Sequence, residues 1–174
     1  MNKPIWLLLT STLLCAGPVW AEGEWDQART AHERGDYSAE LAIVRPLAEQ
    51  GFAFAQFNLG VLYDQGHGVP MDDRQALEWY RKAAEQGLPQ AQINLGIMYE
   101  EGEGGPVDPI QAYFWYAMAE SQGDSQGPQA RQEIAEKMTP AQVAEAEKKV
   151  KDWLATHQFT VPPQPPIEPQ IGSQ

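Results

Sequence analysis

Apolar positions along this chain recur with the spacing of helices, and the helical stripes come in pairs. From Ala55 to Tyr63 they fall at i, i+4, i+7 and i+8, and from Ala76 to Ala83 at i, i+3, i+4 and i+7. Between the two stripes, residues 66–72 contain glycines that end the first helix and an aspartate that can cap the second. The pattern therefore predicts a hairpin of two helices.

The same hairpin pattern returns 36 residues later. Residues 52–87 align with residues 88–123 without a gap, and 17 of the 36 positions are identical. An internal repeat of this length is typical of a solenoid, in which each unit packs on the next. Gly60 and Gly96 lie inside the first helix of their units, where glycine costs about 0.5–1 kcal/mol relative to alanine. We expect helix backbones to approach closely there.

The positions shared by the two units carry a resemblance to a known family. They read Ala-Gln-x-Asn-Leu-Gly-x-x-Tyr-x-x-Gly-x-Gly, then Asp, then Ala-x-x-Trp-Tyr-x-x-Ala and Gln-Gly. This pattern resembles the Sel1-like repeat, a relative of the tetratricopeptide repeat that is built from paired antiparallel helices. The resemblance implies an all-α, right-handed α-solenoid of stacked helix hairpins that binds other proteins.

A degenerate unit precedes the two repeats. Residues 22–51 resemble a first repeat with a shortened turn, because Gly35 and Gly51 lie 16 residues apart where the next unit has 21. This unit lacks the Leu-Gly and Trp-Tyr signatures. Since proline removes a helical hydrogen bond, we expect Pro46 to break its second helix.

Two capping helices are expected in residues 124–157, at about 128–137 and 139–157. The second has a start signal with a cap residue, Thr139, followed by Pro140 and by glutamine at the third position. Its apolar positions then form one stripe, which consists of Val143, Ala146, Val150, Trp153 and Leu154.

The second repeat differs from the first by an apolar stripe on its second helix that packing between repeats does not require. The stripe consists of Ile110, Phe114, Ala117 and Met118. The last unit of an array is normally sealed by a cap, so we expect the helices after Gly123 to cover it. An exposed docking patch for a partner is the alternative.

Both ends of the chain are expected to lie outside the helical array. Residues 1–21 have a basic start, an apolar stretch of twelve residues and small residues at the end, as in an export signal cleaved after Ala21. That stretch is shorter than the ~20 residues of a membrane-spanning helix. The tail, residues 158–174, has five prolines and should be disordered or polyproline-like. These features predict a periplasmic or secreted protein with no stable membrane insertion.

The net charge of the chain limits the kind of molecule that it can bind. The chain has 12 basic and 24 acidic side chains, and its net charge of −12 argues against nucleic acid, which requires a basic face. Between Lys82 and Arg131 there is no basic residue, and that stretch carries a net −7 from Glu85, Glu100, Glu101, Glu103, Asp108, Glu120 and Asp124. Such a field would steer a protein with a basic surface. Solubility alone explains it equally well.

The sequence offers no reaction centre, and we expect no catalytic site, metal or cofactor. Residues 123–127 match G-x-S-x-G, but a nucleophile elbow needs a strand-to-helix turn and no strand pattern surrounds Ser125. The three histidines lack metal-ligand spacing. His67 corresponds to Glu103 in the next unit, which is expected of a solvated loop position. The acids around Glu103 fit no calcium loop.

We therefore expect a non-enzymatic protein-binding module: an adaptor, a regulator or an inhibitor. Some exported proteins of the Sel1-like family act in envelope regulation or as immunity proteins against secreted toxins such as phospholipases. An envelope hydrolase that uses Ser125 and a structural spacer in an envelope assembly stay open as alternatives. The candidate partner-binding residues are Gln56, Asn58, Tyr63, Gln92, Asn94, Tyr99, Glu100, Glu101 and Glu103. Internal hydrogen bonding and core packing are alternative roles for the asparagines and tyrosines, so the charged positions are the stronger candidates.

Overall fold

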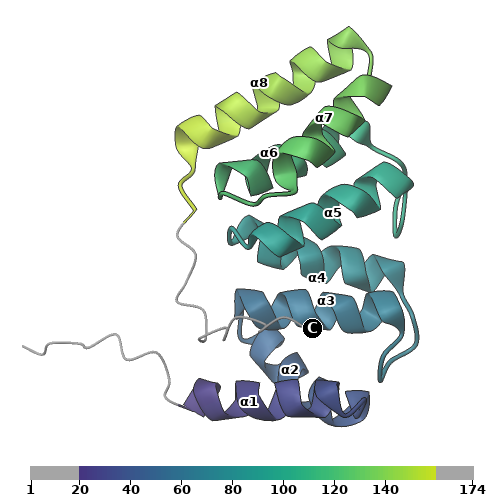
Figure 1. The fold of residues 1–174 in the computed structure, drawn as a ribbon, viewed down its shortest axis with the longest axis vertical. Coiled ribbons are helices and arrows are strands. Elements are labelled where there is room, and N and C mark those ends of the chain that lie inside the picture. The colour runs from purple at the N-terminus through teal and green to yellow at the C-terminus, as the bar shows by residue number, and fades with distance from the viewer. Residues whose placement is uncertain (1–19, 160–174) are drawn as a thin grey trace, which may run out of the picture.

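The computed structural model describes residues 20–159, which form eight helices and no strand. The helices are α1 (Trp20–Glu33), α2 (Tyr37–Glu49), α3 (Ala53–Gln65), α4 (Asp73–Glu85), α5 (Pro89–Glu101), α6 (Pro109–Ser121), α7 (Gly127–Lys137) and α8 (Pro140–Thr156). They stack along the longest axis of the molecule, from α1 at one end to α8 at the other (Figure 1). The predicted all-α stack of helix hairpins is confirmed.

The second helix of each hairpin begins in the same way. Asp36, Asp72 and Asp108 lie 36 residues apart, and each side chain accepts a hydrogen bond from a backbone N–H in the first helical turn, at 3.0–3.1 Å. Such caps satisfy donors that have no partner within the helix. The first hairpin is thus in register with the two repeats from Asp36 onward, and the residues it lacks are missing from the preceding turn.

Pro46 does not break α2, and that prediction was wrong. The helix continues through Pro46 to Glu49. Pro46 is exposed, whereas Val44, Leu47 and Ala48 beside it are buried. Burial of this apolar face offsets the one helical hydrogen bond that proline removes.

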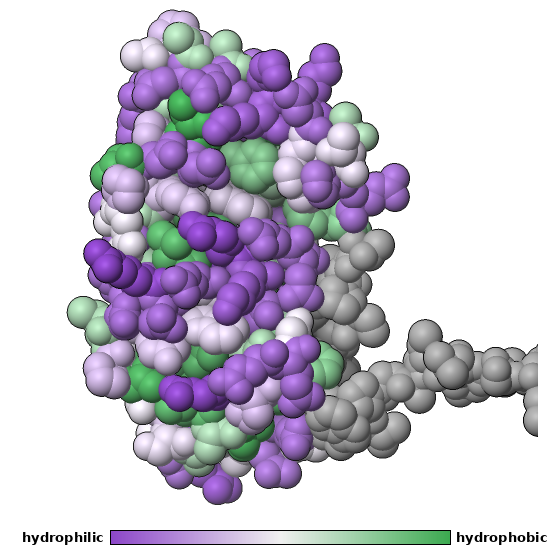
Figure 2. Space-filling model, turned by 180° about the vertical axis from the view of Figure 1, so that it is seen from behind, coloured by the Kyte–Doolittle hydropathy of each residue, from purple (hydrophilic) through white to green (hydrophobic). Residues whose placement is uncertain are grey.

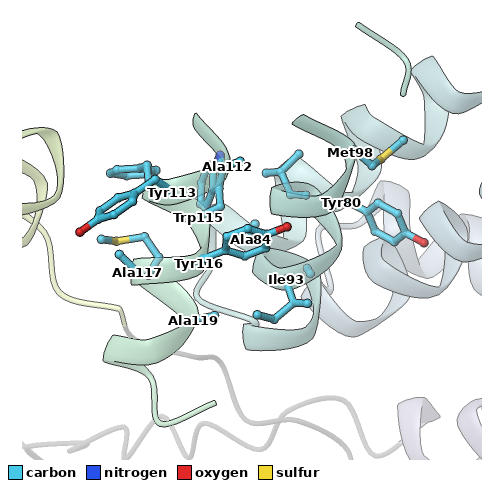
Figure 3. Close-up of a cluster of buried hydrophobic side chains, with 14 of the residues drawn as sticks. Tyr80, Ala84, Ile93, Met98, Ala112, Tyr113, Trp115, Tyr116, Ala117 and Ala119 are labelled. Carbon is cyan, nitrogen blue, oxygen red and sulfur yellow. The ribbon is translucent and has the colours of Figure 1, made fainter. Parts of the chain in front are cut away.

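The glycines inside α3 and α5 make room for a side chain and not for a helix backbone. A β-carbon on Gly60 would lie 2.6 Å from the ring of Tyr80, and one on Gly96 would collide in the same way with Tyr116. Both tyrosines are buried in the second helix of their hairpin (Figure 3). The prediction that helix backbones approach closely at these glycines was wrong, because an aromatic ring fills the space.

The C-terminal helices form the expected cap. Phe114 and Met118 are buried, and the Phe114 ring lies 6.2 Å from that of Trp153 on α8. The apolar stripe of α6 is therefore covered by the chain itself. Thr139 caps α8 with the predicted capping box. Leu154, in contrast, was wrongly assigned to the packed stripe, since it is 43% exposed.

Two of the predicted segments fall largely outside the described residues. The export signal, residues 1–21, is described only at its last two positions, and the proline-rich tail, residues 158–174, only at its first two.

Candidate partner-binding surface

Gln56 and Gln92 lie inside the stack and not on a surface. Gln56 is 6% exposed and Gln92 is fully buried. The Nε2 atom of each donates to a carbonyl oxygen of the preceding hairpin, from Gln56 to Ala48 at 3.2 Å and from Gln92 to Ala84 at 3.1 Å. These two candidates therefore join consecutive hairpins.

Tyr63 and Tyr99 also take part in contacts between hairpins. The hydroxyl of Tyr63 accepts a hydrogen bond from Arg45 at 3.4 Å, and that of Tyr99 accepts one from Arg81 at 2.7 Å. Each pair links the second helix of one hairpin to the first helix of the next. Both tyrosines are half-buried, so their rings are only partly open to a partner.

Asn58 and Asn94 are half-buried on α3 and α5. Near Asn94, the Tyr80 hydroxyl donates to Asp64 at 3.0 Å. Burial and the adjacent Asp64 charge raise the pKa of Tyr80, while the Asn94 side chain acts on it in the opposite sense. Tyr80 consequently stays neutral and remains a hydrogen-bond donor. The partner-binding role of the two asparagines stays a prediction.

Glu100 connects α5 to α6 and α7 by hydrogen bonds. Its carboxylate accepts hydrogen bonds from Tyr116 at 2.8 Å and from Lys137 of α7 at 2.6 Å. Partial burial acts to raise the pKa of Glu100, but the Lys137 and Tyr116 hydrogen bonds outweigh it and hold the pKa below its usual value. Part of the negative charge predicted to face a partner is thus neutralised within the chain.

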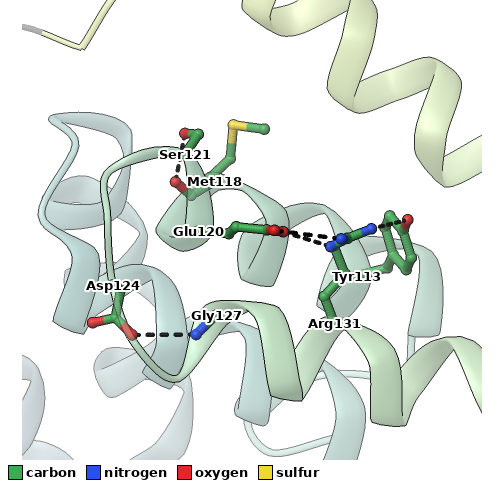
Figure 4. A network of polar contacts seen from close by, with 7 residues as sticks. All are labelled: Tyr113, Met118, Glu120, Ser121, Asp124, Gly127 and Arg131. Atoms are coloured by element: carbon green, nitrogen blue, oxygen red, sulfur yellow. Dashed lines mark hydrogen bonds and ion pairs between the residues drawn. The ribbon is translucent and has the colours of Figure 1, made fainter.

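Glu120 is neutralised in a similar network. Arg131 donates to Glu120 through Nε at 2.6 Å and to the hydroxyl of Tyr113 through Nη1 at 2.9 Å (Figure 4). The capping helix α7 therefore supplies both cations, Arg131 and Lys137, that pair with acids of the second repeat. Of the seven acids in the stretch, two are held in ion pairs of this kind.

Two of the acids without an ion pair, Glu101 and Glu103, lie where the second repeat docks on the first. Glu101, the last residue of α5, is exposed, and Glu103 is half-buried in the turn that follows. Asp64 of α3 and Asp73 of α4 are half-buried close to Glu103. Burial, with the charges of Glu101, Asp64 and Asp73, raises the pKa of Glu103. We call these four residues the acidic junction. No ion pair with a cation occurs in it within residues 20–159.

Two residues of the acidic junction, Glu101 and Glu103, are among the candidates that the sequence indicates. The other two, Asp64 and Asp73, lie in the preceding repeat and are not among them. The two repeats approach each other at the turn glycine Gly104, where a β-carbon would collide with the carbonyl of Asp73. No signal in the sequence indicates that contact, because it depends on how one hairpin docks on the other.

His67, the counterpart of Glu103, is not the solvated loop residue that was expected. Its ring stacks on Tyr37 with centroids 3.8 Å apart and an interplanar angle of 9°. The side chain is half-buried against the start of α2. The same position in the two turns thus carries an aromatic contact in one case and an unpaired acid in the other.

Ser125 lies in the turn between α6 and α7, with helices on both sides. It is exposed and its hydroxyl makes no hydrogen bond to any residue in the range 20–159. The neighbouring Asp124 carboxylate accepts from the backbone N–H of Gln126 at 2.8 Å and of Gly127 at 3.2 Å, which is the arrangement of a helix-starting turn. The G-x-S-x-G match has no strand-to-helix elbow here.

The described residues contain neither a metal-binding cluster nor a membrane-spanning helix. No cluster of three or more histidine, cysteine, aspartate or glutamate side chains there could hold a metal ion. None of the helices from α1 to α8 is long and apolar enough to cross a membrane.

On the face drawn in Figure 2, hydrophilic residues predominate and apolar residues occur in separate small patches.

The stacked hairpins, the capping aspartates and the buried glutamines define a helical solenoid of the repeat class. The Sel1 repeat pattern matches residues 53–88 and 89–124, which span α3 to α6. The chain therefore contains two Sel1 repeats. A comparison with curated protein sequences gives no match.

Two solved structures resemble this fold. One is c5321, a protective antigen present in uropathogenic Escherichia coli strains that displays an SLR fold, with a TM-score of 0.73 and 32% identity over 78% of this chain. The other is a Sel1 repeat protein from Oxalobacter formigenes, with a TM-score of 0.56 and 32% identity over 61% of this chain. The present chain spans 30% and 42% of their lengths, respectively. Sel1 repeats are in general modules for protein–protein interaction.

Proposed function

We propose that this protein binds another protein of basic surface through the acidic junction, without catalysing a reaction. The main support for this proposal is that Glu103 is half-buried beside other acids, while none of the four residues of the acidic junction forms an ion pair within residues 20–159. Burial, together with these like charges, raises the pKa of Glu103. A lysine or arginine from a partner would relieve this repulsion and gain charge-assisted hydrogen bonds. Complementary charge of this kind mainly raises the rate of association and selects the partner.

The position of the acidic junction favours this role. It lies between the two best-matched repeats, on elements whose main chains are fixed by caps and by hydrogen bonds between hairpins. Rigid elements lose little conformational entropy when a partner binds. In contrast, Glu100 and Glu120 are engaged by Lys137 and Arg131 and are less available.

We further propose that the protein acts in the periplasm or outside the cell, after removal of residues 1–21. The support is the pattern of that segment, with its basic start, apolar stretch and small residues before the expected cleavage site. Within that setting the role would be that of an adaptor, a regulator or an inhibitor, for example an immunity protein against a secreted toxin such as a phospholipase.

The experiment is a comparison of two doubly charge-reversed proteins. Tagged wild type, Glu101→Lys/Glu103→Lys and a control, Glu33→Lys/Glu49→Lys, are each used to isolate partners from a periplasmic extract. Glu33 and Glu49 are exposed on the first hairpin, so the control has the same charge change outside the two hairpins that form the acidic junction. We expect the control to retain the partner and the Glu101/Glu103 variant to lose most of it.

Equal retention by both variants would contradict binding through the acidic junction. Retention by neither would mean that overall charge, and not this site, governs capture. Circular dichroism of all three proteins shows whether the helical fold is kept.

A catalytic role through Ser125 has less support. Its hydroxyl has no base within hydrogen-bond reach among residues 20–159, and a weak nucleophile of this kind needs one. Ser125→Ala is therefore expected to leave partner binding unchanged, and any hydrolytic activity that it abolished would revive the hydrolase.

A further inference from the structure

The last described residue, Phe159, packs against the turn between α4 and α5. Its ring lies where a β-carbon on Gly87 would be, with the nearest ring carbon 2.7 Å from that position. The ring also lies against Trp153, at 4.4 Å between centroids, and Trp153 in turn contacts Phe114. A row of aromatic side chains thus runs from α6 through α8 to the turn before α5.

This contact distinguishes Gly87 from the two glycines at equivalent turns. Gly51, Gly87 and Gly123 follow one another at intervals of 36 residues, and their φ angles are 97°, 88° and 83°. A β-carbon on Gly51 or Gly123 would meet no described atom within 4 Å. Within residues 20–159, therefore, one of three similar turns is occupied by an aromatic ring.

A glutamine bridge is present at the first of these turns. There Gln86, the last residue before the Gly87 turn, reaches back over the Gly51 turn. Its Nε2 atom donates to the carbonyl oxygen of Gly51 at 3.0 Å and to Oε1 of Gln56 at 2.7 Å. The bridge satisfies the buried amide of Gln56 and closes the junction between the first two hairpins.

The corresponding bridge is missing at the Gly87 turn. Gln122 is the counterpart of Gln86, but its Nε2 atom donates to the Ser121 hydroxyl at 3.3 Å. Gln92, the counterpart of Gln56, is fully buried, and its Oε1 atom has no hydrogen-bond partner in the described part of the chain. The turn that holds the Phe159 ring is thus the turn that lacks the glutamine bridge.

We propose that the turn at Gly87 is a binding site for an aromatic side chain, that its ligand is Phe159 of this chain, and that Phe159 and Gln122 occupy it alternately. With Phe159 bound, the aromatic row is complete and the Gln92 acceptor is unpaired. With Phe159 released, Gln122 donates to the Gly87 carbonyl and to Gln92, as Gln86 does one repeat earlier. An unpaired buried acceptor costs free energy, so the bridge offsets part of the lost aromatic contact. Residues 157–159 therefore form a releasable clasp.

The clasp joins the cap to the middle of the stack. His157 stacks on Trp153 at 4.5 Å, which turns the chain back after α8. Two residues later, the Phe159 ring lies against the turn before α5. Release would free α8 from the turn before α5 without disturbing the Phe114 contact.

A double-mutant cycle on the full-length protein tests the alternation. Gln122→Ala is made in the wild type and in Phe159→Ala, and the unfolding equilibrium constant is measured in urea. We expect Gln122→Ala to raise that constant less than about twofold in the wild type and about fivefold in Phe159→Ala, because one net hydrogen bond is then at stake. Gln86→Ala is the control, and its effect should be the same in both backgrounds. Equal effects of Gln122→Ala in the two backgrounds would overturn the alternation.

Nuclear magnetic resonance tests the binding site itself. The Phe159 ring should shift the Gly87 signals, and Phe159→Leu should remove that shift while the Gly51 and Gly123 signals stay in place. An unchanged Gly87 signal would overturn the site, whatever the stability of the variants.

Discussion

The two junctions between consecutive hairpins share a backbone design and differ in the side chains placed on it. At the first, Gly68 packs on the carbonyl of Tyr37; at the second, Gly104 packs on the carbonyl of Asp73. The residue before each glycine faces the start of the preceding hairpin's second helix. At the first junction it is His67, stacked on Tyr37; at the second it is Glu103, beside the charge of Asp73.

The shared backbone contacts hold the repeats together, whereas the side chains that differ between the two junctions decide what each junction can bind. The first junction is closed by an aromatic stack, which favours stability. The second junction keeps a repulsion between like charges, which does not stabilise the fold. Sites that are destabilised in this way are more often functional. The negative charge of the second repeat is also unevenly compensated, since the capping helix α7 pairs with Glu100 and Glu120 but not with Glu103.

The largest effect should come from removing the shared backbone contact. Gly68→Ala and Gly104→Ala both place a β-carbon against a backbone carbonyl at positive φ, so each should lower the free energy of unfolding by about 2–4 kcal/mol. Gly35→Ala is the control, because its φ is also positive but its β-carbon would meet no described atom. It should cost only about 1–2 kcal/mol by urea unfolding. Equal losses for all three would mean that strain alone, and not docking, requires glycine.

A smaller effect should distinguish the side chains at the two junctions. His67→Ala removes the stack on Tyr37 and should destabilise the protein by about 1 kcal/mol. Glu103→Ala, at the equivalent position, removes a repelled charge and should be neutral or slightly stabilising. If both substitutions destabilise equally by urea unfolding, the two junctions do not differ in the way described.

The smallest effect is a dependence of stability on pH. Because the pKa of Glu103 is raised in the folded protein, its ionised form opposes folding at neutral pH, and this penalty is relieved as the pH falls through the raised pKa. Glu103→Gln should therefore stabilise the protein at pH 7 by about 0.5 kcal/mol or less, since the group is partly exposed. The gain should shrink toward acidic pH. A gain that grows on acidification would have the wrong sign.

The architecture could be read from the sequence because it rests on local signals. The 36-residue identity, the capping aspartates Asp72 and Asp108 and the Thr139 capping box each act within one helix or turn. The equivalent cap, Asp36, was harder to recognise. The first unit has a shorter turn, so its first helix does not align with the first helices of the two repeats. Pro46 was misjudged because tertiary burial outweighs a local helix-breaking tendency.

The side-chain contacts could not be read in the same way. The Glu100–Lys137 pair joins residues 37 positions apart, and the position of Phe159 on Gly87 depends on how α8 lies on α6. A single aromatic residue at the start of a proline-rich segment has no periodic pattern that would indicate a partner. Most of the uncharged candidates proved to be hydrogen-bonded between hairpins for the same reason, since identity between repeats marks contacts that every repeat makes.

The most direct test of the account is the rate of association with the isolated partner as a function of ionic strength. Wild type, Glu101→Lys/Glu103→Lys and the Glu33→Lys/Glu49→Lys control are compared by stopped-flow or surface plasmon resonance. We predict that the wild type and the control associate faster at low salt and that the Glu101/Glu103 variant associates at least tenfold more slowly, with a much flatter salt dependence. Equal rates and equal salt dependence for all three proteins would contradict the acidic junction as the partner-binding surface.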